Sequence, residues 1–413
     1  MDQRVALIAS VGLVLLLAAI VAMRRSKGYG AQAVGIPTAT SATQYAQIAS
    51  DVSTTRGLPA KTPVPPQFLD QAALTQFLVD NFNRNYLPLE RETDQKMFEV
   101  LGIVQPGQIV YDILMGILQE QAIGVYDQDV NVLNLINSFP ALQQFTYAHE
   151  YAHALQDQYF NLDALQPKLS DNDDRDLGIL AVLEGDAALA QNNWAQQPGR
   201  VSQQDFQRIA NYPRTRLDAA PLYIREQLTF PYIKGPEFVQ YLLQTGGQPA
   251  LNAALSTAPP DSTAQILHPA KYTGRVKPVN AALGDLAAAW GNGWRMVRTN
   301  VMGEENLLNL LKQHGIDSPT GANGWAGDQY QLLEKESYMV WVLNSVWDTP
   351  ADAHNFQAAL SQAMARRFPR AQVRNSTTTR QTLYAPGVGT SDIYIAGPEA
   401  RNVIAIVTFL RPQ

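Results

Sequence analysis

Two histidines and a glutamate near the middle of the chain have the spacing of a hydrolytic metal site. They are His149, Glu150 and His153, in the stretch YAHEYAHALQDQY at 147–159. Residues four apart share one face of a helix, so both imidazoles can bind a single Zn²⁺ through their ring nitrogens. Glu150 takes the next position round the helix and can reach a water bound to that ion. Zinc lowers the pKa of such a water toward about 7. The pattern HExxH therefore predicts hydrolysis with Glu150 as the general base.

A catalytic zinc needs a third protein ligand, and we predict Glu184 for that position. Because the chain contains no cysteine, histidines and carboxylates must hold the ion. Glu184 lies in LAVLEGDAAL, where an acidic side chain in an apolar helix is costly to bury unless it is paired or binds a metal. Gly185 beside it lets two helices approach closely. Asp186 is the alternative ligand, or an outer partner that holds a ligand imidazole in the required tautomer.

Peptide hydrolysis also requires a donor for the oxyanion that forms in the transition state. We predict His268, in ILHPAKY, for this role, and Tyr272 is the second candidate. Asp157 lies four residues after His153, where it drifts off the metal face, so it is predicted to form a structural pair. The acidic stretch DNDD at 171–174 lacks the glycine and the distal glutamate of a calcium loop and predicts a solvated loop.

The beginning of the chain predicts a membrane anchor. Val5–Met23, VALIASVGLVLLLAAIVAM, carries no charge, and as a helix it spans about 28 Å, close to the thickness of a hydrocarbon core. The RRSK that follows is not a small-residue cleavage site, which favours an uncleaved single-pass anchor in the lipid bilayer over a signal peptide. The absence of cysteine favours an extracytoplasmic body, whereas Arg24, Arg25 and Lys27 favour a cytoplasmic one.

The composition is that of a globular protein. The chain has 413 residues, 46% of them hydrophobic and 16% charged, with a net charge of -6. No cluster of basic residues accompanies an aromatic platform, so nucleic acid is not a predicted partner.

Helical spacing dominates the body and predicts an α+β protein that is mainly helical. Ser138 as the cap and Pro140 in the first turn begin the helix that carries HExxH, which runs to about Tyr159. Residues 123–136 predict a strand, or a hairpin that turns at 127–129. Asp70 is a predicted N-cap. Strands are predicted within 324–349 and 391–410, with a helix at 350–368 between them.

The chain resembles a family of uncharacterised bacterial zinc metallopeptidases of the HExxH-plus-Glu (gluzincin, zincin-like) type. The likeness covers most of the chain after about residue 50 and rests on these blocks in this order: RGLPAKTPVPPQFL, EQAIGVYDQDVNVL, TYAHEYAHALQDQYFNLDAL, VLEGDAAL, FPYIKGPEFVQYLLQTGG, PPDSTAQILHPAKY, GWAGDQY and WDTPADAHNF. The resemblance implies the ligands His149, His153 and Glu184 and the base Glu150. It also implies a strand beside the active helix, placed at 124–133, that pairs with extended substrate. Ala270 stands where an acidic residue is expected.

Four regions are predicted on this basis. Residues 1–25 form the transmembrane anchor, 26–66 a linker with a short helix at 42–54, 67–315 a zincin-like metallopeptidase domain with its active helix beside a small sheet, and 316–413 a C-terminal α+β subdomain.

The expected function is a membrane-anchored zinc metallopeptidase that hydrolyses polypeptide substrates. The alternative is a non-catalytic accessory or scaffold subunit of a membrane complex, in which the metal is a staple. Association with such a complex without any peptide cleavage would favour that alternative. A hydrolase of a small amide is a third possibility, which digestion of a peptide library separates from a peptidase.

Overall fold

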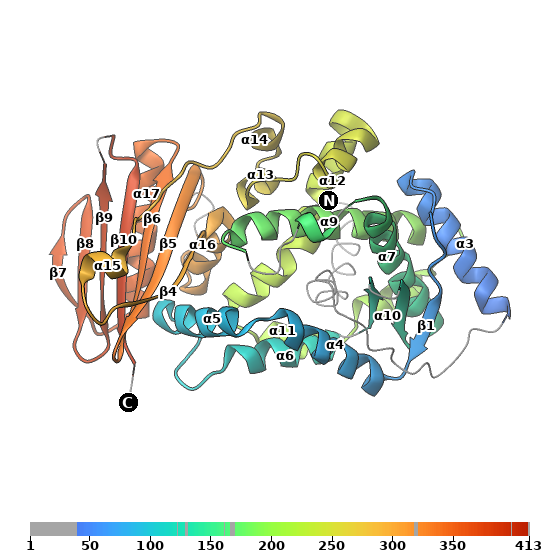
Figure 1. The fold of residues 1–413 in the computed structure, drawn as a ribbon, viewed down its shortest axis with the longest axis horizontal. Helices are drawn as coiled ribbons and strands as arrows, with labels where there is room; N and C mark the ends of the chain where they lie inside the picture. The colour runs from blue at the N-terminus through green and yellow to red at the C-terminus, as the bar shows by residue number, and fades with distance from the viewer. Residues whose placement is uncertain are drawn as a thin grey trace.

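The computed structural model describes residues 39–121, 123–128, 131–160, 162–165, 170–317, 321–397 and 399–411. The predicted anchor, Val5–Met23, lies outside these ranges. Within them, no helix combines the length and the apolar character that a membrane span requires. The architecture is α+β and mainly helical, as predicted, with one small and one large sheet (Figure 1).

The helices make up most of the molecule (Figure 1). They are α3 (Ala39–Arg56), α4 (Gln71–Asn85), α5 (Pro88–Leu101), α6 (Val110–Gln121), α7 (Pro140–Tyr159), α8 (Leu162–Leu165), α9 (Asp173–Ala195), α10 (Gln203–Ala210), α11 (Thr215–Ala219), α12 (Leu222–Ala254), α13 (Thr263–Leu267), α14 (Pro269–Thr273), α15 (Leu286–Trp290), α16 (Gly303–Gln313) and α17 (Pro350–Arg367).

Helix α3 belongs to the folded body, so the prediction of a linker over 26–66 is wrong for this part of it. Tyr45, Ile48 and Val52 are buried on one face of α3, which packs on α7. The ring of Tyr45 lies 4.8 Å from that of Tyr147 on α7. The small and polar residues between these three positions conceal the apolar stripe in the sequence.

Helix α7 carries the HExxH pattern and ends at Tyr159, as predicted. Pro140 is its first residue, where the missing N–H costs nothing. The cap is Phe139 and makes no side-chain hydrogen bond, so the prediction of Ser138 as the cap is wrong. Asp70 caps α4 as predicted, because its side chain accepts a hydrogen bond from the Ala73 N–H.

The small sheet has the strand order β1-β3-β2 and lies against α7. Strand β1 (Pro66–Leu69) runs parallel to β3 (Val132–Ile136), and β2 (Gly124–Asp127) runs antiparallel to β3. Residues 123–136 are predicted to form a strand or a hairpin, and the antiparallel pairing of β2 with β3 shows that they form the hairpin. Strand β2 is at the edge of the sheet.

Helices α9 and α12 cross so closely that only glycine fits at the crossing. A Cβ atom on Gly185 of α9 would lie 2.3 Å from the Gly235 carbonyl carbon of α12. A Cβ atom on Gly235 would lie 2.1 Å from the Ala181 oxygen. The first turn of α9 includes Asp173 and Asp174, and Asp174 is buried, so the solvated loop predicted at 171–174 is in large part helix.

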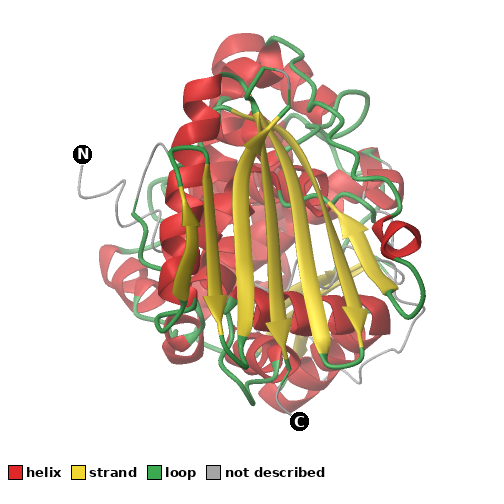
Figure 2. Ribbon diagram, turned by 90° about the vertical axis from the view of Figure 1, so that its left-hand side faces the viewer, coloured by secondary structure: helices red, strands yellow, loops and turns green. Residues whose placement is uncertain are grey.

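The large sheet is antiparallel, with the strand order β4-β5-β6-β10-β9-β8-β7, and helices cover its inner face (Figure 2). Its strands are β4 (Arg295–Asn300), β5 (Trp325–Lys335), β6 (Tyr338–Trp347), β7 (Gln372–Ser376), β8 (Arg380–Ala385), β9 (Gly389–Ala396) and β10 (Asn402–Leu410). Strand β4 precedes the boundary predicted at residue 316, so the sheet draws on residues before it. One continuous hydrophobic core joins the sheet to the helical body.

Candidate metal centre

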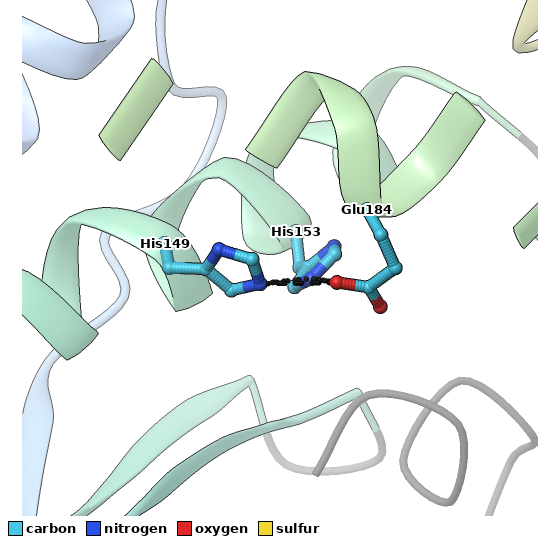
Figure 3. Close-up of side chains that lie close together, drawn as sticks. All are labelled: His149, His153 and Glu184. Carbon is cyan, nitrogen blue, oxygen red and sulfur yellow. Dashed lines mark hydrogen bonds and ion pairs between the residues drawn. The ribbon is translucent and has the colours of Figure 1, made fainter. Parts of the chain in front are cut away.

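Three side chains from two helices converge in the interior. The Nε2 atoms of His149 and His153 lie 3.1 Å apart, and Glu184 Oε2 lies 3.1 Å from the first and 3.5 Å from the second (Figure 3). All three residues are buried. Helix α7 supplies both histidines one turn apart, and the close crossing of α7 with α9 supplies Glu184. This group can hold a metal ion.

The group favours one positive charge among its members. Burial lowers the pKa of His153, but the Glu184 carboxylate outweighs this effect and raises that pKa to about 9. Burial likewise raises the pKa of Glu184, but the two imidazoles outweigh it and lower that pKa to about 2. A cation bound between the three side chains would meet the same electrostatic preference.

A hydrogen-bonded chain fixes the tautomer of His153. The Gln156 amide nitrogen donates to the Leu183 carbonyl and to Asp186, each at 3.0 Å. Gln156 therefore presents its amide oxygen to His153 Nδ1, 2.8 Å away, and that nitrogen must carry the proton. In the neutral imidazole, which is the form that binds a metal, the lone pair of His153 is therefore on Nε2, where the group converges. Asp186 thus acts through Gln156 as an outer partner of His153, which is one of the two roles predicted for it.

Arg56 anchors the outer end of this chain. Its guanidinium lies 2.7 Å from Asp186 and also donates to Gln248 and Asn252 of α12. Arg56 and Asp186 are both buried. Helix α3, of which Arg56 is the last residue, is therefore bound to the machinery that orients His153.

The Gln156→Met variant is expected to lower the affinity for a divalent metal ion by about 10- to 100-fold, the usual cost of losing an outer partner of a ligand. Methionine offers the His153 Nδ1–H only a weak sulfur acceptor in place of the amide oxygen. A competition titration against a chromophoric chelator measures the change. The Gln158→Met variant is the control. Gln158 is also on α7, but its side chain faces away from the histidines and accepts hydrogen bonds from the Lys61 and Thr62 N–H groups. Equal affinities for the two variants would contradict the role of Gln156.

Glu150 lies beside the group with one oxygen held and the other unbound. Its Oε2 accepts from the Tyr126 N–H of β2 at 2.9 Å, and its Oε1 has no hydrogen-bond partner in the described part of the chain. Burial raises the pKa of Glu150, and the neighbouring imidazoles partly oppose this rise. A carboxylate with a raised pKa is suited to take and return a proton near neutral pH.

Tyr232 of α12 completes the site, and the sequence analysis missed it. Its hydroxyl hydrogen-bonds to Glu184, and its ring stacks on that of His149 with centroids 6.3 Å apart. Burial raises the pKa of Tyr232, so the hydroxyl keeps its proton. The signal was Gly235, three residues later, because the glycine crossing with Gly185 brings this turn of α12 to Glu184.

The other candidates serve elsewhere. His268 Nε2 lies 2.7 Å from Glu304 Oε1, and no interaction in the described residues joins His268 to the three ligands. The geometry thus does not support the prediction that His268 binds the oxyanion. The Tyr272 hydroxyl donates to the Ala258 carbonyl, which holds a turn together. Asp157 accepts from the Tyr126 hydroxyl, the structural pairing that was predicted.

Comparisons with known proteins reach only the C-terminal part of the chain. A family model described as a domain of unknown function (DUF8575) matches residues 285–407. This range covers nearly all of the large sheet and lies outside the candidate metal centre. No curated protein and no solved structure matches the chain.

Proposed function

We propose that the protein is a zinc metallopeptidase. The observation that carries the proposal is the position of Glu150, whose unbound carboxylate oxygen lies in a buried site beside His149, His153 and Glu184. A metal that serves only as a staple needs no such neighbour, since an unpaired buried carboxylate oxygen costs stability. The membrane anchor at Val5–Met23 stays a prediction from the sequence.

The spacing of the three ligand atoms supports zinc. In a tetrahedral site with bonds of about 2.0–2.1 Å, ligand atoms lie about 3.3–3.4 Å apart. The separations here are 3.1, 3.1 and 3.5 Å. Two imidazole nitrogens and one carboxylate oxygen are also a ligand set that catalytic zinc uses, with the fourth position open.

Zinc at this site would polarise a water molecule and the scissile carbonyl. The chain's own residues carry the proton. Glu150 Oε1 takes it from the attacking water and passes it to the leaving amine, so the carboxylate is restored. The Tyr126 N–H holds the other oxygen throughout, so the reactive oxygen stays aimed at the site.

Strand β2 offers a place for an extended polypeptide substrate. Tyr126 pairs with Leu133 in the sheet, yet its N–H points away from β3 to Glu150. The other edge of β2 therefore faces the catalytic residues. A peptide that lies extended along this edge brings its scissile bond to Glu150.

The Tyr232→Phe variant is expected to lower kcat by about 100- to 1000-fold, the usual loss when one oxyanion donor is removed. The hydroxyl of Tyr232, beside Glu184, donates to the oxygen on which negative charge develops. KM and metal content are expected to change little. Tyr272→Phe is the control, since it removes a hydroxyl that binds the Ala258 carbonyl and the Arg275 side chain, outside the metal centre. A larger fall in kcat for Tyr272→Phe than for Tyr232→Phe would rule out this assignment.

Metal analysis together with digestion of a peptide library tests the function. The full chain is expected to bind one zinc ion, to lose cleavage on chelation and to regain it when zinc is restored. A chain that binds no zinc after reconstitution, or a zinc-loaded chain that cleaves no peptide, would overturn the proposal.

A further inference from the structure

A cavity of about 270 Å³ lies between α4 and α5 on one side and α9, α12 and the first strands of the large sheet on the other. This volume is below that of sites for drug-sized ligands and suits one long side chain. Aromatic rings form much of its wall, among them Phe82, Phe98 and Tyr223.

Negative charge dominates the polar part of the wall. Glu90, Asp94, Asp173 and Asp176 line the cavity, against the single guanidinium of Arg298. That guanidinium is 3.6 Å from Asp173 and also donates to the Ser170 carbonyl. Burial raises the pKa of Asp94 to about 7, so the charges present do not compensate this carboxylate. The side chain of Asp173 keeps 48% of its surface accessible, and it is part of the cavity wall.

Two tyrosine hydroxyls in the wall have no hydrogen-bond partner in the described part of the chain. Tyr223 and Tyr330 are each 99% buried and line the cavity. Tyrosines buried to this extent normally hydrogen-bond through their hydroxyls, so two of them lining one cavity point to a ligand with hydrogen-bonding groups. Each hydroxyl can accept a hydrogen bond from an N–H group and donate one to a neighbouring carboxylate.

The cavity begins one helical turn from the metal centre on two helices. Leu180 lines the cavity four residues before Glu184 on α9, and Leu228 lines it four residues before Tyr232 on α12. Four residues of α-helix rise about 6 Å. The cavity wall and the metal centre therefore share two helices, at positions one turn apart.

We propose that this cavity binds the cationic side chain of a substrate arginine or lysine adjacent to the scissile bond, an inference that rests on the proposed peptidase function. The carboxylates supply the charge, the tyrosine hydroxyls accept N–H groups, and the rings contact the aliphatic stem and face the cation. A metal ion does not explain the cluster, since no three of its carboxylates in the described residues converge as the ligands of the metal centre do.

Calorimetry tests this inference. The full zinc-loaded chain carries the Glu150→Gln substitution, so that binding is measured without turnover. N-acetyl-arginine amide is expected to bind at least about tenfold more tightly than N-acetyl-norleucine amide, which has no charge. In Asp94→Asn, the ratio of the two affinities is expected to fall about tenfold, which is the effect of one charged hydrogen bond. Asparagine retains the oxygen that accepts from the Tyr86 hydroxyl, so this variant keeps its fold. Asp80→Asn makes the same change on the exposed face of α4 and should alter nothing.

Equal binding of the two amides, or an unchanged preference in both Asp94→Asn and Tyr223→Phe, would overturn the inference. Digestion of a peptide library by the wild-type chain separates it from the proposed function. Cleavage with no preference for arginine or lysine would leave the peptidase function standing and reject the pocket. Selective binding of the arginine amide without any cleavage would reject the function and leave the cationic pocket standing.

Discussion

Peptide hydrolysis is expected to fall by about 10²- to 10⁴-fold in the Glu150→Gln variant, while the chain keeps its metal. General-base catalysis contributes an effect of this size. Glutamine keeps the oxygen that accepts from the Tyr126 N–H, so the side chain stays in place. It loses the basic oxygen that now has no partner, and the amide cannot take a proton from water. None of the three ligand atoms is changed.

Initial rates on a cleaved library peptide, together with zinc content, measure this effect. The Glu237→Gln variant is the control, because it makes the same change on an exposed side chain of α12. Loss of zinc along with activity in Glu150→Gln would show that Glu150 serves to build the site. Retained activity with zinc bound would show that another group takes the proton, and the mechanism proposed for this site would fall.

The parts of the site that the sequence predicts are those that local geometry determines. A spacing of four places His149 and His153 one above the other on any α-helix, whatever surrounds that helix. Glu184 could be chosen because a carboxylate in an apolar helix needs a partner. The helix α17 and the strands β5 and β6 were likewise predictable, since the regular spacing of apolar residues over a long segment indicates its secondary structure.

The parts that the sequence analysis missed depend on contacts between distant segments. Tyr232 reaches the site only because α9 and α12 cross at two glycines. Gly235 lies close to Tyr232 in the sequence, but its spacing does not indicate that it packs on Gly185. His268 was the best donor by residue type, yet its partner Glu304 lies 36 residues later and engages its Nε2 nitrogen. Helix α3 packs on the core through only three buried apolar residues, which is too few to give a clear apolar stripe in the sequence.

The Glu184→Gln variant is expected to lower zinc affinity by more than the 10- to 100-fold typical of an outer partner, because it changes a direct ligand. An amide oxygen is neutral, so it cannot supply the negative charge that raises the pKa of His153 to about 9. Activity should fall in proportion to bound zinc and recover in part at high zinc concentration. This recovery distinguishes Glu184→Gln from Glu150→Gln, whose defect zinc cannot correct.

Glu304→Gln is the matched control for Glu184→Gln. Glu304 is also a buried carboxylate paired with a histidine, at 2.7 Å, but it belongs to a pair outside the metal centre. Both variants remove a buried carboxylate that is paired with a histidine and are expected to lose stability, because the histidine keeps a weaker partner. Only Glu184→Gln should lose zinc. If both variants bind zinc as tightly as the wild type, Glu184 is a structural partner of the histidines, and the third ligand must come from another residue. If both lose it equally, the loss reflects destabilisation of the fold and carries no information about ligation.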